Sequence, residues 1–366
     1  NAKALVAAGY NVVVVSGYAQ SLSQQPELLE PGIWSVQINE RGSEHLPKVL
    51  RYLCYVFIGR QSRKWIDSCD SKPAAIVLYS GYTPYLLQFT RWARRRSIKL
   101  IFDAVEWYTA QSALQFLRSP YYWNIEFAMR VLIPRLDGII SISSSLETYY
   151  KRHIGCVVSI PPLVDMSSMH PRVEFTPSEN GLSIAYSGSP GNKDLLDVII
   201  AAVLEVKLKG ICIQLHIAGV TEHQLLQMPV LEAYQNIGLP SFIMAHGKVS
   251  HERSLSIMRN ADFTVFLREI NRVSTYGFPT KFVESLSVGT PVIANITSDL
   301  AKHLHHGLTG YICNKPTKDG LCEVLQQVVN LNAEKLSQMR VASCREAEQA
   351  FDYIKHVDSI RKALRF

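Results

Sequence analysis

The apolar residues of the chain fall into short runs, separated by longer stretches in which they recur with helical spacing. Such runs are typical of buried strands, and the spacing between them is typical of amphipathic helices. Up to about residue 163, the predicted strands are Val12–Ser16, Ala75–Tyr79, Leu100–Asp103, Gly138–Ile142 and Val157–Ile160. Strands that alternate with helices predict an α/β unit whose parallel sheet has helices on both faces.

The second part of the chain repeats this alternation. Its predicted strands are Leu182–Ser187, Gln214–Ala218, Phe242–Ala245, Phe263–Leu267 and Val292–Ala294, and its predicted helices are His251–Asn260, Asp319–Leu331 and Ala333–Phe351. Between the two parts lies Pro161–Asp165, whose adjacent prolines stiffen the backbone as in a linker. The pattern therefore predicts two doubly wound, Rossmann-like domains.

The first residues fit this scheme only in part. Asn1–Tyr10 has the spacing of a helix, and the strand Val12–Ser16 follows it. A doubly wound domain normally begins with a strand and a glycine-rich turn ahead of its first helix. We therefore expect the first strand of the fold to be missing from this sequence.

Composition and charge narrow the class of protein. The chain has 366 residues, of which 47% are hydrophobic and 19% charged, which excludes a disordered chain and suits two domains. The formal net charge of +7 indicates an anionic partner such as a nucleotide, a phospholipid or a nucleic acid. The seven cysteines lack the close pairs of a metal site and are expected to be reduced thiols in the cytoplasm.

Two stretches in the first domain are both basic and aromatic. Lys48 to Trp65 and Arg91 to Lys99 each combine arginines and lysines with aromatic side chains. Each stretch alone is explained by an amphipathic helix with a solvated charged face. Two of them in one domain favour the alternative of an interfacial surface that faces an anionic membrane. Nucleic acid is not expected as a partner, because no known binding motif accompanies the charge.

The most informative stretch is residues 276–295. Tyr276–Pro279 is expected to be a loop, Pro279 to lie in the first turn of a helix, and Gly289 to end that helix. The N–H groups at the start of the helix form a natural anion site. Glu284 lies one turn further and is too polar to be buried without a partner. The alternative to an anion site is that this stretch is a plain αβ unit with a glutamate on its surface.

This stretch resembles the donor-site segment of the retaining family 4 glycosyltransferases, which have the two-domain GT-B fold. Glu284 matches the second glutamate of the family motif, which binds the ribose hydroxyls of the donor nucleotide, and Gly289 and Pro291 also match. The first glutamate falls at Tyr276 and is absent. Pro279–Thr280–Lys281 resembles the Pro-x-Lys form of a branch that is common among capsule and surface-polysaccharide enzymes.

The resemblance also assigns the turn that follows Leu182–Ser187. Small residues from Gly188 onward allow backbone N–H groups to approach a phosphate. Lys193 matches the family's lysine, whereas the family's arginine is replaced by Ser189. Arg268, at the end of a predicted strand, is expected to supply the missing charge together with Lys281. The alternative is that Lys281 is solvated and that Arg268 pairs with Glu269 or another surface acid.

Two further positions follow from the resemblance. The segment around His246 resembles the family segment whose backbone reads the nucleobase, and a surface histidine remains an equal alternative. Glu106 follows a predicted strand at the sheet edge where α/β folds place ligands, and it would contact the acceptor, as a base. Ser141 or Ser143 would line the cleft, although Ser143 also suits the N-cap of a helix through Tyr150.

Taken together, the resemblance implies a cytoplasmic retaining glycosyltransferase of the hexosyltransferase type, associated peripherally with the inner face of the plasma membrane. Residues 1–163 would form the acceptor domain, with residues 352–366 crossing back onto it, and residues 164–351 would form the donor domain. Its partners would be a nucleotide sugar and a glycan or lipid-linked acceptor, without a metal or other cofactor. The expected catalytic residues are Glu106, Arg268 and Lys193, and the expected donor residues are Gly188, Lys193, His246, Arg268, Phe278, Pro279, Thr280, Lys281 and Glu284.

Two other functions remain open from the sequence. A nucleotide-sugar 2-epimerase on the same fold would turn over the donor without an acceptor. A non-catalytic protein of this fold would account for the absence of the first glutamate, at Tyr276, and of the arginine, at Ser189.

Overall fold

The computed structural model describes the chain except for residues 18–24, 41–45, 48–49, 51–56, 80–82, 111, 173–180, 190–192 and 365–366. The chain divides into two compact units, of which the first comprises Asn1–Pro161 with Tyr353–Phe366 and the second comprises Pro162–Asp352. The boundaries expected from the sequence lie within two residues of these.

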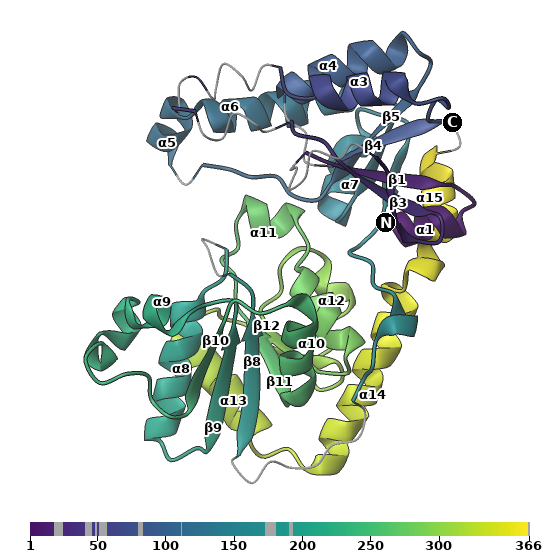
Figure 1. Cartoon of the computed structure of the whole chain (residues 1–366). Coiled ribbons are helices and arrows are strands. Elements are labelled where there is room, and N and C mark those ends of the chain that lie inside the picture. The colour runs from purple at the N-terminus through teal and green to yellow at the C-terminus, as the bar shows by residue number, and fades with distance from the viewer. Residues whose placement is uncertain are drawn as a thin grey trace. The chain divides into compact units, whose positions relative to one another are not determined.

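The second unit is built on one parallel sheet with the strand order β10-β9-β8-β11-β12-β13 (Figure 1). Its strands are β8 (Leu182–Ser187), β9 (Ile213–Ala218), β10 (Ile243–Gly247), β11 (Phe263–Phe266), β12 (Val292–Ala294) and β13 (Gly310–Ile312). The strand order runs outward in both directions from the β8–β11 pair. In a doubly wound sheet this is the topological switch point, where ligands bind beyond the carboxyl ends of the strands.

Helices cover this sheet because each carries an apolar stripe. Helix α8 (Leu196–Leu208) packs against α13 (Lys318–Val328), and α12 (Thr280–Ser287) packs against α10 (His251–Asn260) and α14 (Ala333–Ala350) (Figure 1). Side-chain N-caps fix the starts of several of these helices. For example, Ser250 caps α10 by accepting a hydrogen bond from the Arg253 N–H. The shorter elements of this unit are η3 (Met166–Ser168), α9 (Glu222–Leu226), η4 (Pro229–Tyr234), α11 (Arg272–Tyr276) and η5 (Ser298–Lys302).

The first unit contains two sheets in its described residues. A parallel sheet has the order β4-β5-β6-β7, formed by β4 (Ala75–Tyr79), β5 (Lys99–Ala104), β6 (Gly138–Ser141) and β7 (Val157–Ser159). A separate sheet has the order β1-β3-β2, formed by β1 (Val12–Ser16), β2 (Glu27–Glu30) and β3 (Ile33–Gln37). The expectation that Val12–Ser16 joins one parallel sheet is therefore wrong in detail. The turn at Gly32 makes β2 antiparallel to β3, and β1 takes β3 as its parallel partner.

The helices of the first unit include the C-terminal segment, as expected. Helix α15 (Val357–Leu364) packs against β6, β7 and α1 (Ala2–Ala7). Ser143 caps α7 (Ser144–Lys151) by accepting a hydrogen bond from the Leu146 N–H, which confirms its expected role. The remaining elements are α3 (Arg60–Ser68), α4 (Thr83–Arg94), α5 (Ala113–Arg118), α6 (Pro120–Phe127), the π-helix η1 (Ala128–Leu132), η2 (Ile133–Arg135) and η6 (Tyr353–His356).

Candidate donor site

The candidate site lies at the switch point of the second unit. Gly188 directly follows β8, and Arg268 lies two residues beyond the end of β11. Gly188 has φ +130°, and a Cβ built on it would lie 3.1 Å from the Lys281 Nζ. A Cβ on Gly219, which follows β9, would lie 2.7 Å from the Gly188 carbonyl. Glycine at position 188 therefore lets the turn after β8 approach the start of α12, and glycine at position 219 lets the turn after β9 approach the turn after β8.

A buried carboxylate that the sequence did not identify holds the cations of this site. The Asp194 Oδ1 accepts from the Arg268 Nε at 2.8 Å, and its Oδ2 accepts from the Lys281 Nζ at 2.5 Å. The Tyr186 hydroxyl also donates to the Asp194 Oδ2, at 2.8 Å. Arg268 and Lys281 therefore do lie together, but Arg268 pairs with Asp194 rather than with Glu269.

The ionisation of this cluster follows from burial and charge. Burial alone raises the pKa of Asp194, but Lys281 and Arg268 outweigh it and hold that pKa below its usual value. Burial raises the pKa of Tyr186 far above its usual value, and the Asp194 charge acts in the same direction. Asp194 is therefore ionised at neutral pH while Tyr186 remains a hydrogen-bond donor. Burial lowers the pKa of Lys281, and the charge and hydrogen bond of Asp194 oppose that shift. With Lys281 protonated in this ion pair, two cations face one carboxylate and leave a net positive charge beside the Gly188 turn.

Arg268 is fixed by its backbone as well as by its side chain. Its N–H donates to the Asn295 Oδ1 at 2.8 Å, and the Asn295 Nδ2 donates to the Arg268 carbonyl at 2.9 Å. Asn295 directly follows β12 and is buried. The ends of two neighbouring strands are thus tied together where the arginine emerges, which favours a preorganised cation.

Lys193 lies in the same turn, immediately before Asp194, and it is half-buried. Residues 190–192, which the sequence grouped with the phosphate-binding turn, lie outside the described residues. The structure therefore brings Gly188, Lys193, Arg268 and Lys281 to one edge of the sheet. Their roles toward a donor remain predictions.

The donor loop differs in two details from the expectation. Helix α12 begins at Thr280, and Pro279 is its N-cap in an extended conformation rather than a first-turn residue. Proline has no N–H, so only Phe278 and Thr280 among residues 278–280 have a backbone donor to offer an anion. The Phe278 side chain is buried against Phe282, Phe351 and His303. It therefore anchors the loop to the core.

Glu284 has the partner that its polarity requires. Its Oε1 lies 3.1 Å from the Nε2 of His251, the first residue of α10. The Glu284 side chain is 26% exposed, which leaves part of the carboxylate accessible to a ligand. His251 was missed in the sequence, because pairs between different helices leave no spacing signal.

His246 also has a partner that the sequence did not reveal. The His216 ring, on β9, stacks on it with the ring planes 13° apart, and the His216 Nδ1 lies 3.2 Å from the His246 Nε2. Burial lowers the pKa of His246, and the neighbouring Arg253 acts in the same direction. His246 is half-buried and stacks on His216. It is therefore not the isolated surface histidine of the alternative interpretation.

In the first unit, the predicted acceptor residue lies among other polar groups at the carboxyl edge of its sheet. Glu106 follows β5 and interacts with the Tyr108 hydroxyl, and burial together with that carboxylate raises the pKa of Tyr108. Asp103, within β5, is buried, and burial raises its pKa to about 6. Ser141 is also buried, and its hydroxyl donates to the Val158 carbonyl at 3.3 Å. Acceptor contact by Glu106 remains a prediction.

The described residues show neither a metal-binding cluster nor a membrane-spanning helix. They contain no group of three or more histidine, cysteine or acidic side chains arranged to hold a metal ion. None of the helices in the part of the chain that the structure describes combines the length and hydropathy needed to cross a membrane.

Comparison with known proteins identifies the class. Residues 1–160 match the model of the "Glycosyl transferase 4-like domain", and residues 181–331 match that of "Glycosyl transferases group 1". No curated protein sequence matches the chain significantly. The two domain matches and the two Rossmann-like units together define a glycosyltransferase with the GT-B fold.

Solved structures agree with this fold at low sequence identity. Sucrose-phosphate synthase from Thermosynechococcus elongatus is 15% identical with a TM-score of 0.73, covering 98% of this chain and 89% of that chain. A glycosyltransferase from Rickettsia africae is 15% identical with a TM-score of 0.68, covering 99% and 92%. Anabaena HepE, solved in complex with UDP and glucose, is 14% identical with a TM-score of 0.65, covering 99% and 94%.

Proposed function

We propose that this glycosyltransferase is a retaining enzyme that transfers a sugar from a nucleoside diphosphate sugar to a glycan or lipid-linked acceptor. The observation that carries the proposal is the convergence of Arg268 and Lys281 beside the Gly188 turn at the switch point of the second unit. A site with net positive charge at the carboxyl ends of parallel strands suits a diphosphate. HepE, which shares the fold, was solved with UDP and glucose.

In the proposed mechanism the protein acts mainly through electrostatics. The diphosphate gains negative charge as the bond to the sugar breaks, so cations fixed near it stabilise the transition state more than the ground state. Lys193, Arg268 and Lys281 would supply this charge in place of a metal ion, with the Phe278 and Thr280 N–H groups. Asp194 would hold two of the three cations in position before the donor arrives.

The remaining donor contacts follow from the same arrangement. The Glu284 carboxylate, partly exposed on α12, would accept hydrogen bonds from the ribose hydroxyls. The segment of His246 would read the nucleobase. Glu106, in the first unit, would act on the acceptor hydroxyl as a base.

A panel of sugar nucleotides would test this function directly. Donors that bind the folded protein raise its melting temperature, and mass spectrometry then reports transfer to glycan or lipid-linked acceptors. We expect one donor class to stabilise the protein and to be consumed only when an acceptor is present. Turnover of the donor without an acceptor would instead indicate an epimerase, and stabilisation without any turnover would indicate a non-catalytic protein.

We further propose a role in surface-polysaccharide synthesis at the cytoplasmic face of an anionic membrane. The support is the Pro279–Thr280–Lys281 sequence together with the formal net charge of +7. Electrostatic attachment of this kind weakens as salt screens the charges. Co-sedimentation with anionic vesicles should therefore fall as salt is added. Equal sedimentation with neutral vesicles would contradict the electrostatic part of the proposal.

A further inference from the structure

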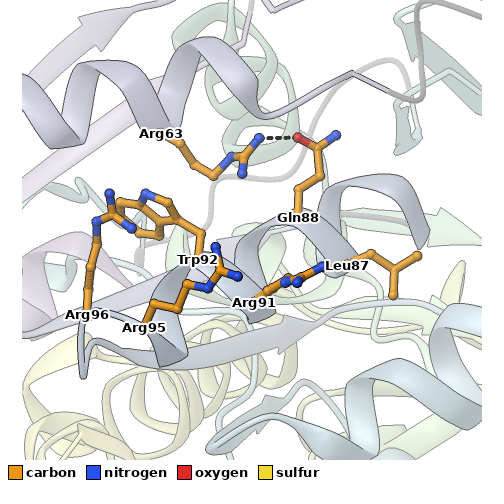
Figure 2. A pocket seen from close by; sticks show the side chains of 7 residues that line it. All are labelled: Arg63, Leu87, Gln88, Arg91, Trp92, Arg95 and Arg96. Atoms are coloured by element: carbon orange, nitrogen blue, oxygen red, sulfur yellow. Dashed lines mark hydrogen bonds between the residues drawn. The ribbon is translucent and has the colours of Figure 1, made fainter.

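A pocket between α3 and α4 in the first unit gathers positive charge from both basic stretches of the sequence. It encloses about 300 Å³. Arg63 reaches it from α3, and the other side chains come from α4 and the residues directly after it (Figure 2). The lining residues are Arg63, Leu87, Gln88, Arg91, Trp92, Arg95 and Arg96. Lys48, Arg51, Tyr52 and Tyr55 of the first basic stretch lie outside the described residues.

One carboxylate and one aromatic ring fix the wall of this pocket. Arg96 forms a two-point ion pair with Asp67, through its Nε at 2.8 Å and its terminal nitrogen at 2.9 Å. The Trp92 Nε1 donates to the same Asp67 at 3.2 Å, and the Arg96 guanidinium lies 4.7 Å from the Trp92 ring centroid. Asp67 is therefore occupied by partners that hold the wall in place.

The other arginines of the pocket retain their charge for a ligand. Arg63 donates to the Gln88 side chain, a neutral partner (Figure 2). Arg91 and Arg95 are exposed and have no ion pair with any carboxylate in the described part of the chain. Burial lowers the pKa of Arg63. The neighbouring Arg60 and Arg96 also lower this pKa, whereas Glu40 and Asp67 raise it. The pocket thus concentrates like charges that neighbouring acids compensate only in part.

Stabilisation of the end of α4 does not explain this concentration. Basic residues in a last helical turn interact favourably with the helix dipole, which amounts to about half an elementary charge. Arg91 and Arg94 lie in the last turn of α4, and the Arg94 guanidinium donates to the Arg135 carbonyl at 3.1 Å. Arg95 and Arg96 follow the helix and Arg63 belongs to a different helix, so three arginines of the pocket lie outside that turn.

We propose that this pocket binds a phosphoryl group. Guanidinium groups bind phosphate oxygens through paired N–H donors, and clusters of arginines from different elements are typical of such sites. Helix α4 ends at Arg94 just before β5 begins at Lys99, so the end of the pocket formed by Arg95 and Arg96 faces the amino edge of the sheet. Glu106 follows the opposite end of β5. A strand of six residues is about 20 Å long, so Glu106 and this end of the pocket are separated by the length of the strand. Binding of a phosphoryl group in this pocket therefore does not depend on sugar transfer.

The test compares two pairs of substitutions that remove the same charge. The variant R91Q/R95Q neutralises the two exposed arginines of the pocket, whereas R118Q/R152Q neutralises two exposed arginines elsewhere in the first unit. Calorimetry with inorganic phosphate at constant ionic strength measures binding. We expect R91Q/R95Q to raise the dissociation constant of the pocket at least tenfold and R118Q/R152Q to leave it unchanged. Phosphate bound in the second unit is common to the unsubstituted protein and both variants, so its contribution cancels in the comparison.

A second arm distinguishes a free phosphate from a lipid headgroup. Vesicles that contain phosphatidic acid, a phosphomonoester, are compared with vesicles of equal surface charge that contain phosphatidylserine. A preference for phosphatidic acid that is lost in R91Q/R95Q supports the pocket and identifies a lipid source. Phosphate binding that is weakened in R91Q/R95Q, without that lipid preference, supports the pocket and identifies a soluble source. If R91Q/R95Q matches R118Q/R152Q in both arms, the proposal is wrong, whether or not the protein transfers sugar.

Discussion

At the scale of single residues, Glu284 offers the sharpest test of the donor site. We expect Glu284→Ala to weaken binding of the nucleoside diphosphate while the fold is retained. A charge-assisted hydrogen bond contributes about 1.5–3 kcal/mol, so loss of one or two such bonds to the ribose should raise the dissociation constant roughly tenfold or more. Titration calorimetry measures the change. Glu252→Ala, which removes an exposed carboxylate from α10, is the matched control, and equal affinities for the two variants would exclude Glu284 from the ribose site.

Arg268 is expected to act on the rate more than on binding. Its charge matters most when the diphosphate departs, so Arg268→Ala should lower kcat by about a hundredfold or more with a smaller change in KM. The same change leaves Asp194 with Lys281 and Tyr186 as partners, so the cluster remains partly compensated. Arg345→Ala on α14, an exposed arginine in the same unit, controls for loss of charge. Full activity of Arg268→Ala in a sugar-transfer assay would remove Arg268 from the site.

Asp103 should give the protein a measurable dependence on pH. Burial raises the pKa of its carboxyl to about 6 in the folded state, above the usual 3.8. Between these values the folded protein binds more protons than the unfolded chain, so this group makes stability fall as pH rises from about 4 to about 6. Asp103→Asn should remove that slope and raise the free energy of unfolding at neutral pH. Urea titrations at several pH values compare the two proteins, and parallel curves would contradict the assignment.

At the scale of elements, a buried arginine on α14 joins the ends of two other helices. Arg340 is fully buried, and its guanidinium donates to the carbonyls of Arg259 in the last turn of α10, of Ala261 directly after α10 and of Gly289 after α12. It also donates to the Arg172 carbonyl at 3.3 Å. Burial lowers the pKa of Arg340 to about 10, and the neighbouring Arg172 acts in the same direction. The side chain therefore stays charged at neutral pH while it satisfies carbonyls that the helix ends leave free.

Removal of these donors should destabilise the second unit. Arg340→Met keeps an apolar side chain in the same space but leaves several buried carbonyls unsatisfied, at a cost of about 1–3 kcal/mol for each group. We expect a loss of about 3 kcal/mol or more in the free energy of unfolding, measured with urea. The exposed Arg345→Ala on the same helix should change it by less than about 0.5 kcal/mol. A stability equal to that of the control would show that the carbonyls find other partners.

The agreement between predicted and observed structure also differs by element. Strands β8, β11 and β12 were predicted closely because they are buried on both faces and read as unbroken apolar runs. Strand β2 was missed because all its residues are exposed and give no such pattern. Helix α11 was not predicted, because its five residues are too few to show a period.

The candidate site was predicted in the same uneven way. Gly188, Lys193, Arg268 and Lys281 were named from motifs and from the ends of predicted strands, and the structure brings them together. Asp194, His216 and His251 were missed. Their importance lies in contacts between elements far apart in the chain, which depend on how the sheet and helices pack rather than on local spacing.

At the scale of the whole molecule, the second unit is one continuous segment with its own sheet and core. Its ends are held together, because the Val164 N–H donates to the Phe351 carbonyl at 2.9 Å and Val164 pairs with Asp352. Phe351 itself is buried against Phe278 and Phe282 within the same unit. A chain cut at the boundaries of Pro162–Asp352 therefore keeps both its closing contacts and its core.

We expect a fragment of residues 162–352 to fold alone and to bind the nucleoside diphosphate as the full chain does. All the proposed donor residues lie within it, whereas Glu106 and the proposed acceptor side do not, so the fragment should transfer no sugar. Thermal melting followed by circular dichroism tests folding, and calorimetry on the fragment and the full chain compares affinity. Glu284→Ala within the fragment should weaken binding as it does in the full chain. A folded fragment that binds at least tenfold more weakly than the full chain would show that the first unit contributes to the donor site.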